Sequence, residues 1–360
     1  LNYKLDVAFE LFKKLAENGN GRAMYFLGEF YSYPYGKTKK DNEKSKEWRI
    51  KGKEAGDVLA ALNVAYSLPE DSDERNRICF ELFKDILKLA EAGDIFAQNE
   101  LADMYLYGYG IEEDEEEGVK WLKKSAEAGY WRSMSKLANC YSDGIGVPQD
   151  KLKAIDLYKR VYELGSGKAA NRIGLIYNNQ NNLEKAVNWF KKGFEKGDDW
   201  SGYNLASFYS NGIGVPQDKQ KALELYKKVY ELGDSASGAA ASIVGAVYVE
   251  REEFKEAYKW YKRSLEYGVE RAEEMLAMVD CLLARKEEEL ALNEQTKALE
   301  EALQVVQDFN GTPWDMKKQQ IVEEKERIVE EKKRIVEEKK RIAKEKEQIM
   351  EEKQKKFGSS

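Results

Sequence analysis

Apolar side chains recur every three or four positions along most of the chain, which is the spacing that places them on one face of an α-helix. In residues 96–108, Ala97, Leu101 and Tyr105 lie four positions apart and so share one face. Residues 116–129 repeat the pattern, with these small or apolar side chains on one face: Gly118, Trp121, Leu122, Ser125 and Ala126. The pattern predicts two short helices in succession, followed by a glycine that suits a helix C-cap.

This helix pair is one unit of a tandem repeat. Residues 141–165 and 209–233 are nearly identical, and a glycine closes each unit at intervals of 32 to 37 residues. The closing glycines are Gly19, Gly56, Gly93, Gly129, Gly165, Gly197, Gly233 and Gly268. Eleven positions before most of them stands a small residue: Ala8, Ser45, Gly118, Ala154, Ala186, Ala222 and Ala257. Since one pair cannot bury its apolar face alone, the units are predicted to stack into an all-α solenoid.

A tyrosine marks the same place in most of the first helices. These tyrosines are Tyr31, Tyr105, Tyr141, Tyr177, Tyr209 and Tyr248. An aromatic stripe at helical spacing is typical of a core and not of a cofactor site. We therefore interpret the six rings as core residues.

The loop GIGVPQD occurs twice, at residues 144–150 and 212–218. Glycine-rich phosphate loops follow a strand and carry a Lys-Ser/Thr pair or a third glycine, and this loop has neither feature. We interpret it as the hinge between the two helices of a unit. Gly144 would end the first helix, Val147 would pack into the stack, and Asp150 would cap the second helix.

The first helix RAMYFLGEFY (22–31), the GxGV-P-x-D loop and second helices such as EAYKWYKRSLEYG (256–268) resemble the Sel1-like repeat, a relative of the tetratricopeptide repeat. The resemblance covers residues 1–268, about seven helix pairs, and is looser in the first two units. It implies a right-handed superhelix whose first helices line a concave face that takes extended peptides or partner loops. Residues 6–19 look like a second helix without its first, so an upstream part is expected to be missing from this sequence.

The residues after the repeats lack the closing glycine but keep an apolar helix face. Two capping helices, roughly 269–285 and 287–308, are predicted to cover the open end of the solenoid. Pro313 is expected to end any helix, and Asp315 to cap the next one. The predicted organisation is a repeat solenoid (1–268), capping helices (269–309), a break (310–315), a charged helix (316–357) and a Gly-Ser-Ser end typical of a cloning scar (358–360).

The charged helix repeats a seven-residue unit of the form IVEEKKR. Pairs such as Glu323–Arg327 stand in the favourable i,i+4 order, each contributing ~0.2–0.5 kcal/mol. A coiled coil needs apolar residues at positions a and d, yet with Ile321 at a, Glu324 falls at d. Three interpretations stay open: a solvated single helix, a weak coiled coil that would let the chain self-associate, or a helix docked on the solenoid or on a partner.

Composition removes several classes of function. The chain contains no histidine, so Ser–His–Asp and Cys–His sites and His-ligated zinc are excluded. Its net charge of −7 argues against nucleic acid as the principal ligand, because phosphate binding needs an excess of Lys and Arg. No stretch approaches the ~20 apolar residues that span a bilayer. We therefore expect a protein that is not an enzyme, has no cofactor or metal and does not enter a membrane.

Three cysteines, Cys79, Cys140 and Cys281, lie far apart and form no CxxC pair. We interpret them as buried reduced thiols, which are typical of a cytoplasmic protein. Some members of the resembled family are secreted and carry a disulfide in each repeat. The paired cysteines that this needs are absent here, which weakens an extracellular assignment.

The resemblance also implies which side chains line the concave face. By alignment with tetratricopeptide repeats, the partner-binding residues are Tyr25, Glu29, Asn99, Asp103, Arg132, Ser135, Asn139, Asn171, Asn178, Trp200, Tyr203 and Ser207. An asparagine amide can donate to and accept from a peptide backbone at once, and related repeats use Asn in this way. Trp200 and Tyr203 would supply apolar anchors. The alternative is that all twelve are ordinary polar helix surface.

Two functions stay open at this stage. The first is a non-catalytic scaffold or adaptor that binds a peptide or a partner protein on the concave face. The second is a regulatory subunit or effector that controls a partner enzyme through the solenoid and the C-terminal helix. Loss of partner control with groove binding intact, after deletion of that helix, would favour the second.

Overall fold

The computed structural model describes residues 2–32, 40–69, 72–306 and 312–357, and every regular element in these ranges is an α-helix. The predicted all-α class is confirmed. The chain divides into two compact parts, residues 1–201 and 202–360, here called the N-terminal body and the C-terminal body. Each is described by itself.

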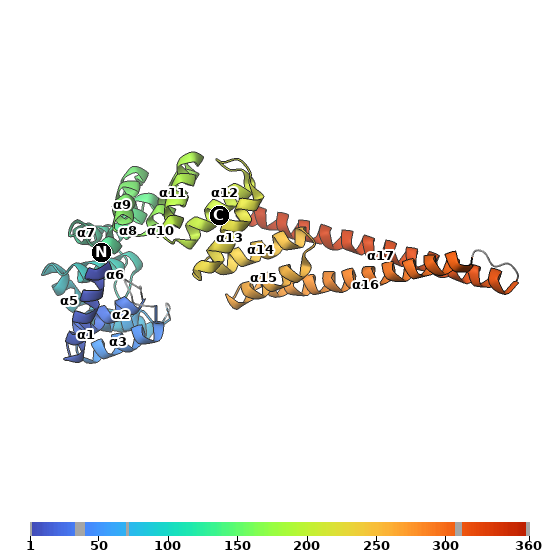
Figure 1. The fold of residues 1–360 in the computed structure, drawn as a ribbon. Helices are drawn as coiled ribbons and strands as arrows, with labels where there is room; N and C mark the ends of the chain where they lie inside the picture. Colours follow the sequence, from blue (N-terminus) through green and yellow to red (C-terminus); the bar gives the residue numbers. More distant parts are fainter. Residues whose placement is uncertain (1, 33–39, 70–71, 307–311, 358–360) are drawn as a thin grey trace. The chain divides into compact units, whose positions relative to one another are not determined.

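The helix pairs of the repeat follow one another along the chain (Figure 1). The N-terminal body contains α1 (Asn2–Glu17), α2 (Gly21–Ser32), α3 (Asn42–Glu54), α4 (Val58–Ala65), α5 (Asp73–Glu91), α6 (Ile95–Tyr107), α7 (Glu115–Glu127), α8 (Trp131–Asp143), α9 (Lys151–Glu163), α10 (Gly167–Asn179) and α11 (Leu183–Glu195). Helix α12 (Asp199–Asn211) spans the division. The C-terminal body continues with α13 (Lys219–Leu232), α14 (Ser237–Glu250), α15 (Phe254–Glu266), α16 (Arg271–Val306) and α17 (Thr312–Phe357). From α2 to α15, even numbers are first helices and odd numbers are second helices.

The third repeat unit shows why small residues recur on the second helix. Ala97 and Leu101 of α6 are fully buried, as predicted. A Cβ atom on Gly118 of α7 would lie 2.7 Å from Cγ of Leu106, closer than two carbon atoms can stand. The small residue therefore lets α6 and α7 approach, and it is also buried at the equivalent position of most other units.

The closing glycines all have a left-handed backbone, as their place after a helix predicts. Their φ values run from 70° at Gly233 to 113° at Gly165. At Gly129, an added Cβ would meet no atom within 4 Å. Glycine is therefore needed there for its backbone conformation and not for space.

The GIGVPQD loop is a hinge, as predicted, and also a contact between repeat units. Gly144 ends α8 with φ of 81°, and the Asp150 carboxylate accepts hydrogen bonds from two N–H groups of α9, at 3.0 and 3.1 Å. The Gly146 N–H donates to the Glu115 carboxylate of the preceding unit at 2.9 Å. A Cβ on Gly146 would clash with the backbone of that same residue. The second glycine thus permits close approach between neighbouring units.

The six equivalent tyrosines are half-buried instead of fully buried. In four units a lysine ammonium lies 4.0 to 5.6 Å from the ring centre, which is the range of a cation–π contact. The pairs are Lys44–Tyr31, Lys153–Tyr141, Lys185–Tyr177 and Lys221–Tyr209. Each lysine stands twelve positions before its closing glycine, so this contact is part of the repeat. Tyr105, Tyr141, Tyr177 and Tyr248 pack against the buried core, so the core interpretation is confirmed for them, with part of each ring left exposed.

The C-terminal body ends in two long helices: the predicted charged helix is confirmed as α17, whereas the predicted pair of capping helices is wrong. The two capping helices are one continuous helix, α16, because no glycine or proline interrupts the hydrogen-bond ladder between 285 and 287. Its first turns pack against α15. Helix α17 begins at Thr312, so Pro313 and Asp315 lie inside its first turn, where proline loses no hydrogen bond. The other residues of the predicted break, 310–311, lie outside the described residues.

Helices α16 and α17 run antiparallel, side by side (Figure 1). The buried side chains of Ile328 and Ile335 form a cluster with Leu292 and Leu299 of α16. Polar contacts fill the half of the seam that lacks apolar residues: Lys332 to Thr296 at 2.9 Å, Lys325 to Glu300 at 2.6 Å and Arg285 to Glu338 at 2.8 Å. The charged helix is thus docked within its own chain, on the preceding helix.

Candidate interaction surface

An arginine near the start of α2 connects three first helices of the N-terminal body. Nε of Arg22 donates to Asp57 at 2.7 Å, and its Nη1 donates to Asp94 at 2.5 Å. Asp57 and Asp94 are the N-caps of α4 and α6. Although burial opposes the charge, both aspartates raise the pKa of Arg22. One guanidinium therefore holds the starts of α2, α4 and α6 together.

Further ion pairs link α2, α6 and α8. Glu29 of α2 accepts from Arg49 of α3 at 2.8 Å and pairs with Arg132 of α8. Lys136, one turn along α8, pairs with Asp103 of α6 at 2.5 Å. None of these five side chains is more than 27% exposed, so salt screens the pairs less than it screens surface pairs. Three of the predicted partner-binding residues, Glu29, Asp103 and Arg132, thus contact their own chain.

Tyr25 and Asn99 lie deeper still, and their predicted exposure to a groove is not seen. Both residues are only 1% exposed. The amide of Asn99 accepts from the Ser133 hydroxyl at 3.0 Å and donates to Glu100 at 3.3 Å. Alignment with related repeats assigns a residue to a helix face, but it does not say how closely the next helix covers that face.

Glu100 is a buried carboxyl group beside these ion pairs. It is 6% exposed, and among the described residues no cation lies within ion-pair distance of it. Burial raises the pKa of Glu100 to about 7, and the negative charges of Asp103 and Glu29 act in the same direction. One buried oxygen of Asp103 also lacks a hydrogen-bond partner among the described groups.

The same face becomes more open at α8 and α10. The predicted residues Ser135, Asn139, Asn171 and Asn178 are half-buried there. The Asn139 amide oxygen accepts a hydrogen bond from the Tyr158 hydroxyl, which fixes the amide in place. The Ser135 hydroxyl donates within its own helix, to the Trp131 carbonyl at 3.1 Å.

Two residues on this face were not predicted. Tyr107, at the end of α6, is 57% exposed. Partial burial of its hydroxyl raises the pKa of Tyr107; Asp103 acts in the same direction and Lys136 in the opposite one. Lys136 itself has a raised pKa, because the attraction of Asp103 and Glu100 outweighs its burial. Neither residue belongs to a motif. For Arg22 a signal existed, since a Gly-Asp pair recurs at 56–57 and 93–94.

The last three predicted residues lie on α12. Trp200 is 41% exposed. In the C-terminal body the Tyr203 ring packs against the Tyr226 ring, with 5.3 Å between the ring centres. The carbonyl of Ser207 accepts from the Asn211 amide at 2.9 Å. Tyr203 therefore packs against the next helix of the repeat, whereas this Ser207 contact lies within α12.

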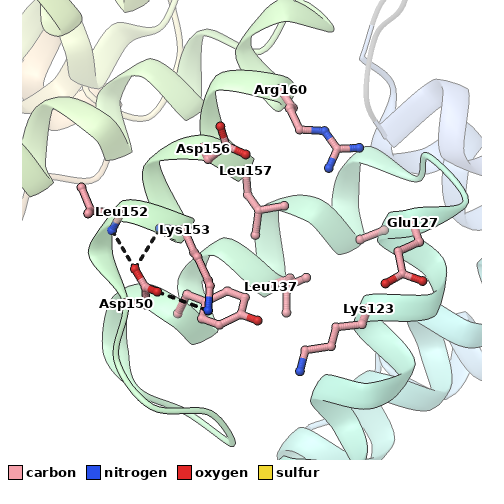
Figure 2. A pocket seen from close by; sticks show the side chains of 11 residues that line it. Lys123, Glu127, Leu137, Asp150, Leu152, Lys153, Asp156, Leu157 and Arg160 are labelled. Carbon is pink, nitrogen blue, oxygen red and sulfur yellow. Dashed lines mark hydrogen bonds and ion pairs between the residues drawn. The ribbon is translucent and has the colours of Figure 1, made fainter.

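A hollow of about 510 Å³ lies elsewhere in the N-terminal body, against α7, α8 and α9. Leu137 and Leu157 supply apolar wall, and charged side chains such as Lys123, Glu127 and Arg160 surround it (Figure 2). None of the twelve predicted residues lines this hollow. Its basic and acidic groups are mixed, so its charge favours no class of ligand.

Disulfides and metal-holding arrangements are two features that cysteines and acidic groups can form. All three cysteines are free, with Cys79 and Cys140 buried as predicted and Cys281 exposed, contrary to prediction. In the part of the chain that the structure describes, no group of three or more Cys, Asp or Glu is arranged to hold a metal ion. Within that same part, no helix combines the length and the apolar character needed to cross a bilayer.

The fold and its surfaces define an α-solenoid built from short helix pairs. The Sel1 repeat family matches the chain at residues 2–20, 21–57, 95–130, 131–166, 167–198, 203–234 and 244–266. The chain belongs to the Sel1 repeat family. The match passes over 58–94, the second unit, which has Leu82 in place of the small residue.

Similar proteins share parts of this chain. An F-box protein of Arabidopsis thaliana, At1g70590, is 36% identical over 98 residues, which are 27% of this chain and 26% of the relative. The chain therefore matches about a quarter of that protein's length.

Two solved structures are similar to this chain. The protective antigen c5321 of uropathogenic Escherichia coli is 27% identical, with a TM-score of 0.47, 75% of this chain covered and 58% of the antigen. Yeast Tom70 is 15% identical, with a TM-score of 0.50, 79% of this chain covered and 60% of Tom70. The second likeness shows the fold alone.

Proposed function

We propose that this chain is a non-catalytic scaffold that binds an extended peptide or a partner loop on the face formed by α6, α8 and α10. Solenoids of this kind generally present extended surfaces to protein partners. The observation that carries the proposal is that side chains at one repeated helix position become less buried along one face. The fifth residue of the first helix is buried in α2 and α6 (Tyr25, Asn99) but half-exposed in α8 and α10 (Ser135, Asn171).

Three chemical features of the open part suit a peptide backbone. Asn139 is held by Tyr158 through its amide oxygen, so its amide nitrogen is oriented for a second contact. Asn171 is half-buried on the next first helix and carries a second amide on the same face. Tyr107 adds an exposed ring for an apolar side chain. Amides that contact main-chain groups, beside one aromatic anchor, bind a peptide with modest sequence preference.

A random 12-residue peptide library displayed on phage, selected against the full chain, tests this proposal. The double variant Asn139→Asp/Asn171→Ala removes both amide donors and keeps an acceptor for Tyr158. We expect the Kd of a selected peptide to rise at least tenfold, since each lost hydrogen bond weakens binding by about 1 kcal/mol. Fluorescence anisotropy would give both Kd values.

The matched control is Asn179→Ala, an exposed asparagine at the end of α10. Its Kd should stay within about twofold of the parent value. Circular dichroism and thermal unfolding would show that all variants are folded. Equal Kd values for the parent chain and the double variant would refute the proposed surface.

Self-association through the charged helix stays a separate prediction. Ile328 and Ile335 of α17 pack on α16, and Val322 and Val329, each 42% exposed, are among the described apolar side chains that a second copy could contact. Size-exclusion chromatography with light scattering would measure the mass of the full chain.

A further inference from the structure

Because the chain contains no histidine, it lacks the groups that usually titrate near neutral pH. Histidine is the side chain that ordinarily changes charge between pH 5 and 8. Burial moves the two buried thiols further from neutral pH. It raises the pKa of Cys79, and it raises the pKa of Cys140 to about 11. A carboxyl group that titrates near neutrality would therefore dominate the response of the fold to pH in this range.

Glu100 is a carboxyl group placed where its charge would affect the contacts between helices. It lies on α6, between the ion pairs that join α6 to α8 and α2 to α8. The charged and titratable groups that face it are Tyr25 and Glu29 of α2, Tyr66 of α4, Asp103 of α6, and Arg132 and Lys136 of α8. Both cations are already paired with other carboxylates, so among the described residues an ionised Glu100 has no ion-pair partner of its own and accepts only the hydrogen bond from the Asn99 amide.

We propose that Glu100 is a proton switch that locks the first helices of the N-terminal body together when protonated and loosens them when ionised. A protonated Glu100 is neutral and fits its desolvated site. An ionised Glu100 adds a third negative charge beside Asp103 and Glu29 and lacks water to solvate it. The switch acts on α6 and α8. These helices form the part of the face where the side chains change from buried to half-exposed.

The direction of the pH effect follows from linkage. The pKa of Glu100 is about 7 in the folded chain and near 4.5 when the side chain is exposed, so the folded state binds the proton more tightly. The folded state is therefore favoured most below pH 4.5 by this group. That advantage is lost as pH rises from 4.5 to 7, and above pH 7 the full cost of ionisation is present.

Urea unfolding of the full chain between pH 5 and pH 7.5 tests the switch. For wild type, this group alone should raise the unfolding equilibrium constant roughly fiftyfold across that range. Glu100→Gln should change by less than about threefold, because a neutral amide cannot ionise. The control Glu113→Gln alters an exposed glutamate of the same repeat unit and should follow wild type. Equal pH dependence in wild type and Glu100→Gln would overturn the proposal.

A direct titration keeps the proposal testable even if Glu100→Gln folds poorly. In wild-type protein labelled with carbon-13 at glutamate carboxyls, one resonance should titrate with a midpoint near pH 7. Asp103→Asn should move that midpoint to lower pH, because it removes a neighbouring negative charge. If every glutamate carboxyl titrates below pH 5, the switch does not exist.

Discussion

Helices α6 and α10 both have asparagine as their fifth residue, yet the two side chains differ in role. Asn99 is 1% exposed and bonds to Ser133 and Glu100, whereas Asn171 is half-exposed. The repeat assigns both residues to one face. What separates them is burial: Asn99 lies beside the hydrogen bond to Ser133 and the Lys136–Asp103 ion pair, which join α6 to α8.

Arg22→Ala should break the closed part of the face most severely. The substitution leaves the partly buried carboxylates of Asp57 and Asp94 without their cation, and we expect a loss of about 3 kcal/mol in the free energy of unfolding. Urea unfolding measures it. Hydrogen exchange should rise at the starts of α4 and α6 and stay unchanged in α10. A loss below about 1 kcal/mol would mean that the ion pairs of Arg22 contribute no more to stability than exposed surface pairs do.

Asn99→Ala and Asn171→Ala test the comparison itself, because they are the same change at the same helix position. Asn99→Ala leaves the Ser133 hydroxyl buried with one partner fewer, and we expect a cost of about 2 kcal/mol. Asn171→Ala should cost less than Asn99→Ala, because the Asn171 side chain is half-exposed and water can replace a contact that is lost. Thermal unfolding of the two variants side by side would show the difference. Equal costs would contradict the distinction between a closed and an open part.

Lys136→Met should have the smallest of the three large effects, about 1 kcal/mol, because it leaves one carboxylate without a cation and keeps the apolar stem. Lys136 stands where the closed part meets the open part. Hydrogen exchange should therefore increase locally in α6 and α8. If exchange also rises throughout α2 and α4, the ion pairs act as one network and not as separate links.

The sequence was enough to predict the repeat, its helices and its hinge. Closing glycines, small residues and the aspartate that caps α9 are local signals, and each corresponds to a local requirement such as a left-handed backbone at Gly129. The long helices were harder. The stretch around Lys286 was expected to separate two helices, yet it contains no residue that breaks one. The partner of the IVEEKKR helix could not be predicted, since half of its seam is polar.

The candidate surface was predicted only as a face. Glu29, Asp103 and Arg132 were correctly grouped on first helices, but their pairing joins residues up to 103 positions apart, and no local pattern encodes that. Glu100 was not singled out at all, because nothing in its flanking residues distinguishes it from an exposed glutamate. Its raised pKa arises from burial and from charges on other helices.

The sequence by itself determined the repeat period, the helix pairs and the absence of histidine, because these depend on backbone preferences and on composition. The tertiary structure alone decided which positions of one repeated face are buried, which ions pair across it and where α17 packs. Those outcomes depend on distances between helices, and free energies of burial and of charge pairing change steeply over a few ångströms. The same asparagine is therefore a core residue in α6 and a candidate for partner contact in α10.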